Sequence, residues 1–106
     1  ESWNGSSWTT VNSMNTARFS QAGFGIQTAA VGAGGFIGGV TAATELWNGT
    51  SWTSNPTGLG TAVSSNYGVG SQSDGLSIGG YNGSAETNVT QEWSGTNLAT
   101  RTITVS

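Results

Sequence analysis

A nine-residue segment at the start of the chain recurs almost unchanged 44 residues later. Glu1-Ser-Trp-Asn-Gly-Ser-Ser-Trp-Thr9 returns as Glu45-Leu-Trp-Asn-Gly-Thr-Ser-Trp-Thr53, and a diverged third copy begins at Gln91. The tryptophans Trp3, Trp47 and Trp93 are therefore 44 and 46 residues apart. A period of this length, filled with glycine and strand-forming residues, is typical of a stacked all-β repeat. Such a unit cannot bury both of its faces alone, so the period predicts assembly from several repeats.

Composition argues against several classes of function. The 106 residues include no Cys and no His, and the only basic side chains are Arg18 and Arg101. Metal, redox and histidine chemistry are therefore not expected, and neither a metal nor a cofactor is predicted. The formal net charge of −3 disfavours nucleic acid, which is bound through a basic surface. The most apolar run, residues 29–39, is too short and too rich in glycine to span a membrane.

Each repeat is predicted to contain four short strands and no helix. Apolar residues alternate at Ala22, Phe24 and Ile26, which places them on one face of a strand. Glycines occupy the other face in both repeats, and glycine inside a strand usually marks a close approach by another backbone. The predicted strands are 19–26, 28–35, 44–47 and 51–53 in the first repeat, and 64–71, 75–80, 89–93 and 98–105 in the second.

The Trp-Asn-Gly segment is predicted to be a β-hairpin, because Asn-Gly is a strong turn signal. Trp47 and Trp52 then lie on the same face in either of two geometries. They are diagonal neighbours across a two-residue turn, or a direct cross-strand pair across a four-residue loop. Most of the five tryptophans are expected to lie in the core, since aromatic pairs bury large areas.

The two repeats resemble kelch repeats. That pattern has a small apolar residue and an Arg opening the first strand, paired glycines ending the second, a Glu and an aromatic in the third, and a Trp in the fourth. The first repeat matches at Met14, Arg18, Gly34, Gly35, Glu45, Trp47 and Trp52. The second matches at Leu59, Gly79, Gly80, Gln91 and Trp93, but Val63 replaces the Arg and Leu98 replaces the Trp. The Trp3 and Trp8 hairpin carries the same signature, and such arrays are also similar to those of virion and phage tail-associated proteins.

The resemblance implies an all-β fold of propeller blades, each with four antiparallel strands. The expected divisions are a partial hairpin at 1–13, a blade at 14–58 and a blade at 59–106. Two blades cannot close a ring, which typically has four to eight. Homo-oligomerisation would close it, with three chains giving six blades as the first expectation and four chains giving eight as the second. The 1–13 hairpin lacks inner strands of its own, so we expect either a blade shared between chains or a chain cut from a longer array.

The function expected is a non-enzymatic structural or recognition module, with a virion or extracellular surface favoured. Phe36 and Tyr81 follow the paired glycines and open the longest loops, and Asn82 follows Tyr81. Aromatic rings beside Asn, Ser and Gly are typical of sites for glycans or protein surfaces, although packing of both rings is an equal alternative. Arg18 is expected to make structural hydrogen bonds. One competing hypothesis is a glycan-acting enzyme that uses Glu45 and Glu92, and another is a piece of a longer propeller with no ligand of its own.

Overall fold

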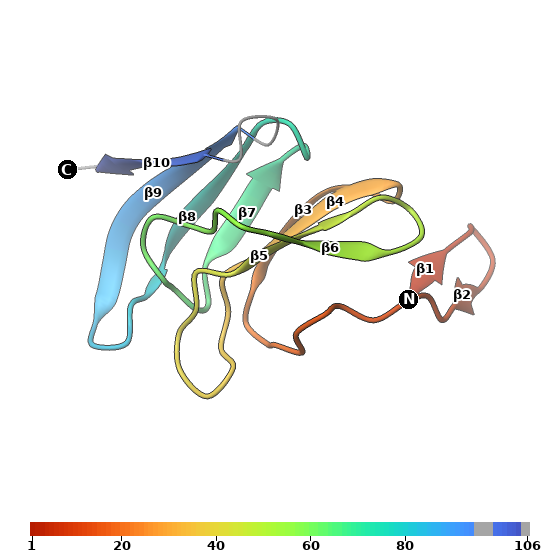
Figure 1. Cartoon of the computed structure of the whole chain (residues 1–106), viewed down its shortest axis with the longest axis horizontal. Coiled ribbons are helices and arrows are strands. Elements are labelled where there is room, and N and C mark those ends of the chain that lie inside the picture. Colours follow the sequence, from red (N-terminus) through yellow and green to blue (C-terminus); the bar gives the residue numbers. More distant parts are fainter. Residues whose placement is uncertain (95–98, 105–106) are drawn as a thin grey trace.

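The computed structural model describes residues 1–94 and 99–104, and within these residues the chain is all-β, with ten strands and no helix (Figure 1). All of the strand pairing is antiparallel, as predicted. The strands are β1 (Ser2–Trp3), β2 (Trp8–Thr9), β3 (Ala22–Ile26), β4 (Ala29–Ala33), β5 (Thr44–Trp47), β6 (Trp52–Asn55), β7 (Tyr67–Gly70), β8 (Gly75–Tyr81), β9 (Glu86–Ser94) and β10 (Ala99–Thr104).

The strands form two four-stranded sheets and a separate hairpin. The first sheet has the order β3-β4-β5-β6, the second has the order β7-β8-β9-β10, and β1 pairs with β2. Each four-stranded sheet is one of the two predicted repeats, and neither sheet closes on itself. The first strands begin at residues 22 and 67, later than predicted. Ser20 and Ser65, with φ of 57° and 55°, interrupt the extended backbone just before them.

The two sheets lie side by side, with β3 next to β7 at the centre of the molecule (Figure 1). Side chains of both sheets and of the segment that connects them form one hydrophobic core. Its buried members are Phe24, Val31, Ala33, Leu59, Val63 and Trp93. Because each sheet supplies part of this core, the sheets stabilise one another, as expected of stacked repeats.

Glycines of the second sheet make room for the first. A Cβ added to Gly75 would overlap the ring of Phe24, and one added to Gly68 would lie 2.7 Å from Cδ1 of Phe24. Gly68 therefore marks a close approach between neighbouring repeats, as the sequence predicted. A Cβ added to its counterpart Gly23 would meet only the backbone oxygen of Val31, at an ordinary contact distance of 3.9 Å. The glycines at 25 and 70 instead allow positive φ, at 110° and 119°, where each first strand ends.

The backbone conformation requires glycine at the paired positions of both sheets. Gly34 and Gly35 have φ of 73° and 108°, and Gly79 and Gly80 have φ of 63° and 111°. Side chains rarely adopt this left-handed region, and a Cβ on Gly35 or Gly80 would also lie within 2.8 Å of a backbone oxygen. In the second sheet these residues lie inside β8, where the register shifts between Ile78 and Gly80.

The hairpins resolve the two geometries left open by the sequence. Trp47 pairs directly with Trp52, with ring centroids 5.3 Å apart, so the connection is a four-residue loop. The prediction that most tryptophans are buried is wrong for the N-terminal hairpin, where Trp3 and Trp8 are 43% and 64% exposed. Their rings still pair, at 5.4 Å. They stay exposed because β1 and β2 have no inner strands of their own sheet to pack against.

The predicted match of Leu98 to a strand tryptophan lies outside the described residues. In β10 the residue that pairs with Trp93 is Thr100. The second sheet therefore lacks the tryptophan pair that Trp47 and Trp52 form in the first.

Candidate functional site

Two loops project from the same end of the two sheets (Figure 1). One joins β4 to β5 and the other joins β8 to β9. Their tips are neighbours, because a Cβ added to Gly83 would lie 3.4 Å from Cγ2 of Val40. The sequence predicted binding residues in these two loops, so the structure brings the two predicted segments together.

Phe36 is half-buried at the base of the first loop. Its backbone N–H donates to the carbonyl of Phe19 at 2.9 Å, and the two rings lie 5.3 Å apart at 45°. Phe36 thus has a packing role, which the sequence analysis held open beside a ligand role. Phe19 itself is 62% exposed, and it was not among the residues predicted to bind a ligand. Its position in the sequence could have indicated this, because the predicted first strand begins at Phe19 and pairs with the segment that leads to Phe36.

Tyr81 occupies the equivalent position in the second sheet but has a different neighbour. Its backbone pairs with Ser64, with N···O distances of 2.8 and 2.9 Å. Ser64 takes the place of Phe19, so no aromatic ring lies at the equivalent position opposite Tyr81. Tyr81 is 39% exposed and Phe36 is half-buried, so Tyr81 is the more accessible of the two aromatic residues.

A backbone link joins the two aromatic positions. The N–H of Ser65 donates to the carbonyl of Ser20 at 2.7 Å, which holds the start of the second repeat beside the start of the first. Ile37, next to Phe36, is 50% exposed. We call the residues Phe19, Phe36, Ile37 and Tyr81, with their two loops, the loop surface. It offers exposed apolar groups flanked by Gly, Ser and Asn.

Asn82, the third predicted binding residue, has a structural task. Its side-chain oxygen accepts the backbone N–H groups of Ser84 and Ala85, both at 3.0 Å. Asn48 does the same for Thr50 and Ser51 at 2.8 and 2.9 Å. The Asn oxygen therefore forms the turn, which leaves the side-chain amide group as the part of Asn82 that could donate to a ligand.

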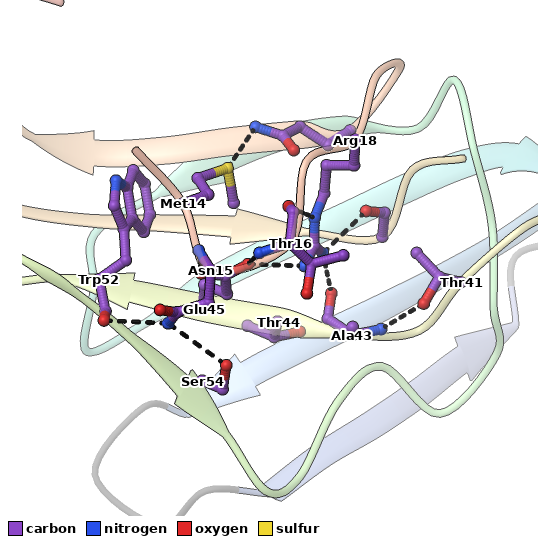
Figure 2. Close-up of polar contacts among 12 residues, drawn as sticks. Met14, Asn15, Thr16, Arg18, Thr41, Ala43, Thr44, Glu45, Trp52 and Ser54 are labelled. Atoms are coloured by element: carbon purple, nitrogen blue, oxygen red, sulfur yellow. Dashed lines mark hydrogen bonds and ion pairs between the residues drawn. The ribbon is translucent and has the colours of Figure 1, made fainter. Parts of the chain in front are cut away.

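Glu45, one of the two acids in the enzyme hypothesis, is buried in an ion pair (Figure 2). Nη2 of Arg18 donates to its carboxylate at 2.8 Å, and both side chains are 1% exposed. The backbone N–H groups of Asn15 and Thr16 also donate to it, at 2.7 and 3.1 Å. Arg18 donates further to the carbonyls of Gly34 and Ala43, which is the structural role predicted for it.

The second sheet replaces this ion pair with neutral groups. Val63 stands at the position of Arg18, and Gln91 stands at the position of Glu45. Oε1 of Gln91 accepts a hydrogen bond from the backbone N–H of Thr61 at 2.8 Å, and Nε2 of Gln91 donates one to the backbone carbonyl of Thr61 at 3.0 Å. A carboxylate at position 91 would be a buried charge without a partner, because Val63 replaces the arginine. The second sheet therefore has a neutral glutamine where the first sheet has a glutamate.

The described residues contain no group of three or more His, Cys, Asp and Glu side chains that could hold a metal ion. Over the same residues, no helix is long and apolar enough to cross a membrane. Neither the family models nor the curated proteins searched contain a match to the chain. The geometry is therefore the basis on which a function is proposed.

Proposed function

We propose that the chain is a non-enzymatic structural and recognition module built from kelch-like propeller blades. The first and second sheets are two blades, and the N-terminal hairpin is the outer half of another. The loop surface is the recognition face. The observation that carries the proposal is a contact between neighbouring units that occurs twice in succession along the chain.

That contact is made by a glutamine after the first strand of each sheet. In the second sheet, Nε2 of Gln72 donates to the carbonyls of Ala30 and Trp47 of the first sheet, at 3.0 and 2.8 Å. In the first sheet, Nε2 of Gln27 donates to the carbonyl of Trp3 in the N-terminal hairpin. Trp3 and Trp47 are equivalent residues of the repeat. The same joint therefore connects the hairpin to the first sheet and the first sheet to the second.

A second repeated bond strengthens this joint. Nε1 of Trp47 donates to the carbonyl of Gln27 at 2.9 Å, and Nε1 of Trp93 donates to the carbonyl of Gln72 at 2.8 Å. Each glutamine is thus held by a tryptophan of its own sheet while it reaches the preceding unit. Regular joints of this kind support a stack of equivalent units that continues beyond two.

In this proposal, copies of the chain supply the blades that close the ring. Three chains giving six blades is the first expectation, and four chains giving eight is the second. The N-terminal hairpin forms a sheet of two strands, which supports a blade shared between chains. Repeated loop surfaces around a ring would give several weak sites, so avidity would supply the affinity that one site lacks.

The ligand class that fits the loop surface is a glycan or a protein surface, on a virion or cell exterior. Exposed rings beside small polar residues suit stacking on a sugar ring or on an apolar protein patch. The enzyme alternative is less well supported, since Glu45 is buried and paired with Arg18. A retaining or inverting glycosidase needs two carboxyl groups that face one cleft.

Binding of the full chain to a glycan array, beside an assay for released sugar, tests the recognition role. We expect binding without turnover, and we expect Tyr81→Ala to weaken it about tenfold or more, which is roughly 1.4 kcal/mol. Asn12→Ala is a control, because Asn12 donates to the carbonyl of Thr50 between β5 and β6, at the other end of β5 from the loop surface. Sugar release that is lost on Glu92→Gln replacement would instead support the enzyme. Equal binding by Tyr81→Ala and the unsubstituted chain would remove the loop surface as the site.

A further inference from the structure

We propose that the outer face of the second sheet docks onto the first sheet of a second copy of this chain, head to tail, in competition with the N-terminal hairpin. This inference rests on the proposed function and names its partner and contact residues. Tyr67 and Val69 of one copy would lie over Gly23 and Ala30 of the other. The basis is the interface already present between the two sheets of one chain, which shows how the equivalent faces fit.

Equivalent residues of the two sheets differ in exposure because only one of them is covered. Ala22, Phe24 and Ala33 of the first sheet are 2%, 9% and 2% exposed, since the second sheet lies against them. Their counterparts Tyr67, Val69 and Ile78 are 67%, 38% and 38% exposed. An apolar face that is core in one repeat is therefore open in the next, which is the pattern of a stack that continues.

The sizes of the contact residues change together. Within the chain, the large Phe24 lies against Gly75, where a Cβ would overlap its ring. At the proposed joint, the smaller Val69 would face Ala30, which has a Cβ. Within the chain, the small Ala22 lies against Gly68, and at the joint the larger Tyr67 would face Gly23, where a Cβ would meet only a backbone oxygen of its own sheet at 3.9 Å. Each face carries one ring and one small apolar residue in exchanged order, so the sizes of the facing residues would be complementary at the joint.

The hydrogen-bonding groups of the joint are also available in both copies. Gln72 donates to the carbonyls of Ala30 and Trp47 within the chain. The equivalent joint would place Gln27 of the second copy beside the carbonyls of Gly75 and Trp93. In the single chain, Gln27 instead donates to Ser2 and Trp3 of the N-terminal hairpin. The hairpin thus offers the first sheet the same carbonyl that Trp93 of a second copy would offer.

The hairpin covers this face incompletely. A cavity of about 470 Å³ remains between the N-terminal segment and the first sheet, lined by Met14, Ala30, Trp47 and Trp52 among others. Two short strands fill the place that four strands fill between the sheets. We infer that the hairpin is a displaceable cap, which a whole sheet of a second copy would replace because it covers more of the apolar face.

One residue of the docking face departs from its counterpart. Glu92 stands where the first sheet has Leu46, which packs against the core between the sheets. Glu92 is next to Leu76 across β8 and β9, so the docking face carries an acidic residue beside an apolar one. Burial of a charged group opposes docking. We therefore expect Glu92→Leu to strengthen association between copies, whereas a charge introduced on the same face should weaken it.

Disulfide trapping tests the docking, because the chain has no cysteine of its own. A Cβ on Gly68 would lie 3.0 Å from Cβ of Ala22, which is shorter than the roughly 3.5–4.5 Å of a disulfide. Two separate chains can move apart by this small difference, so cysteines at the equivalent positions can be bridged. The equivalent pair between copies is Gly23 and Tyr67. We would mix full-length Gly23→Cys with full-length Tyr67→Cys under mild oxidation and identify the dimers by mass.

The mixed dimer should form about tenfold or more faster than either homodimer, because docking raises the effective concentration of the two thiols. A third substitution, Val69→Asp on the Tyr67→Cys chain, should return that rate to the rate of the homodimers, whereas Glu92→Leu should increase it. A predominance of the Tyr67→Cys homodimer would show that the outer faces meet head to head and would overturn the proposal. Equal rates for all three dimers would also overturn it.

The same samples separate this inference from the proposed function. The chain with Val69→Asp alone should still bind the ligand of the loop surface, with the affinity of a single site and without the gain from avidity. Val69 pairs with Leu76, which lies at the other end of β8 from Tyr81. Ligand binding without a mixed dimer would remove the docking and leave the recognition role. A mixed dimer from a chain that binds no glycan or protein would leave the docking and remove the recognition role. Unchanged circular dichroism of each variant confirms that it is folded.

Discussion

At the scale of single residues, the buried pair of Arg18 and Glu45 is the most informative contact, since the second sheet shows how it can be replaced. We predict that Arg18→Val alone lowers the free energy of unfolding by about 3–5 kcal/mol, because Glu45 then stays buried without its cation. Adding Glu45→Gln recreates the Val63 and Gln91 combination and should recover most of the loss. Urea unfolding of the three chains measures both effects.

The control for this cycle is Glu45→Gln alone, which leaves Arg18 buried beside a neutral amide and should also destabilise. If the double variant is no more stable than Arg18→Val, the ion pair is not the cause of the loss. A change in the slope of unfolding free energy with urea would point to a less cooperative transition rather than to this contact.

A second residue-scale prediction concerns the fit of Phe24 against Gly75. Gly75→Ala puts a Cβ into the Phe24 ring and should cost about 1–3 kcal/mol through overpacking. Adding Phe24→Val to this chain reproduces the pair of Val69 and Ala30 in the proposed joint between copies. The free energy of unfolding lost by the double variant should therefore be smaller than the sum of the losses of the two single variants. Chemical denaturation of the full cycle gives this coupling free energy.

Gly23→Ala is the matched control, because its nearest neighbour is 3.9 Å away and its φ is not positive. It should change the free energy of unfolding by less than about 0.5 kcal/mol. A loss at residue 23 equal to that at residue 75 would show that strand flexibility, rather than the ring contact, decides the effect. It would also weaken the size complementarity on which the docking of a second copy depends.

At the scale of elements, the two Trp-Asn-Gly hairpins have the same turn in different surroundings. Gly5 and Gly49 have φ of 98° and 97°, so an alanine at either position carries a similar strain of about 1–2 kcal/mol. We predict that Gly49→Ala lowers the global unfolding free energy by about this amount, because its hairpin is half of the first sheet. Gly5→Ala should leave global unfolding nearly unchanged and raise only the amide exchange of residues 2–9. Hydrogen exchange with urea unfolding distinguishes the two. Equal global losses would show that the N-terminal hairpin unfolds together with the sheets.

The elements themselves were largely predictable from the sequence. Alternation and the repeat period located all four strands of each sheet to within a few residues, because both depend on local spacing. Two details escaped prediction. The strand starts are displaced by the positive φ of Ser20 and Ser65, for which serine gives no strong signal. The exposure of Trp3 and Trp8 depends on strands that their hairpin lacks, and composition alone says nothing of it.

At the scale of the whole molecule, the open faces predict behaviour that depends on concentration. A chain that associates through folded faces is stabilised by mass action, so its thermal midpoint should rise by several degrees over a hundredfold increase in protein concentration. Light scattering should show three or four chains at the upper end of the range. Val69→Asp should give a single-chain mass and a midpoint that does not change with concentration. A constant midpoint and a single-chain mass for the unsubstituted protein would contradict closure of a ring by copies.

The sequence predicted the positions of the candidate site residues, and the structure showed their contacts. The sequence predicted that Phe36 and Tyr81 follow the paired glycines and open long loops, since the repeat aligns them. The prediction of a long loop is wrong in the second sheet, because β8 continues to Tyr81 and β9 begins at Glu86. Only the structure showed that Phe36 packs on Phe19, that Asn82 uses its oxygen to form a turn, and that Tyr81 has no ring at the equivalent position opposite it. These differences come from the residues at positions 19 and 64, which local patterns do not connect to the loops.

The all-β class, the two repeated units, the presence of the Trp-Asn-Gly hairpins and the small number of basic residues follow from the sequence alone, because each depends on residue type and short spacing. The tertiary structure decided which faces are covered, which glutamine joins which unit, and where Phe24 meets Gly75. These contacts join residues about 25 to 50 positions apart, and their fit depends on the shape of both partners. Local propensity cannot supply that shape, since it arises only when the sheets pack together.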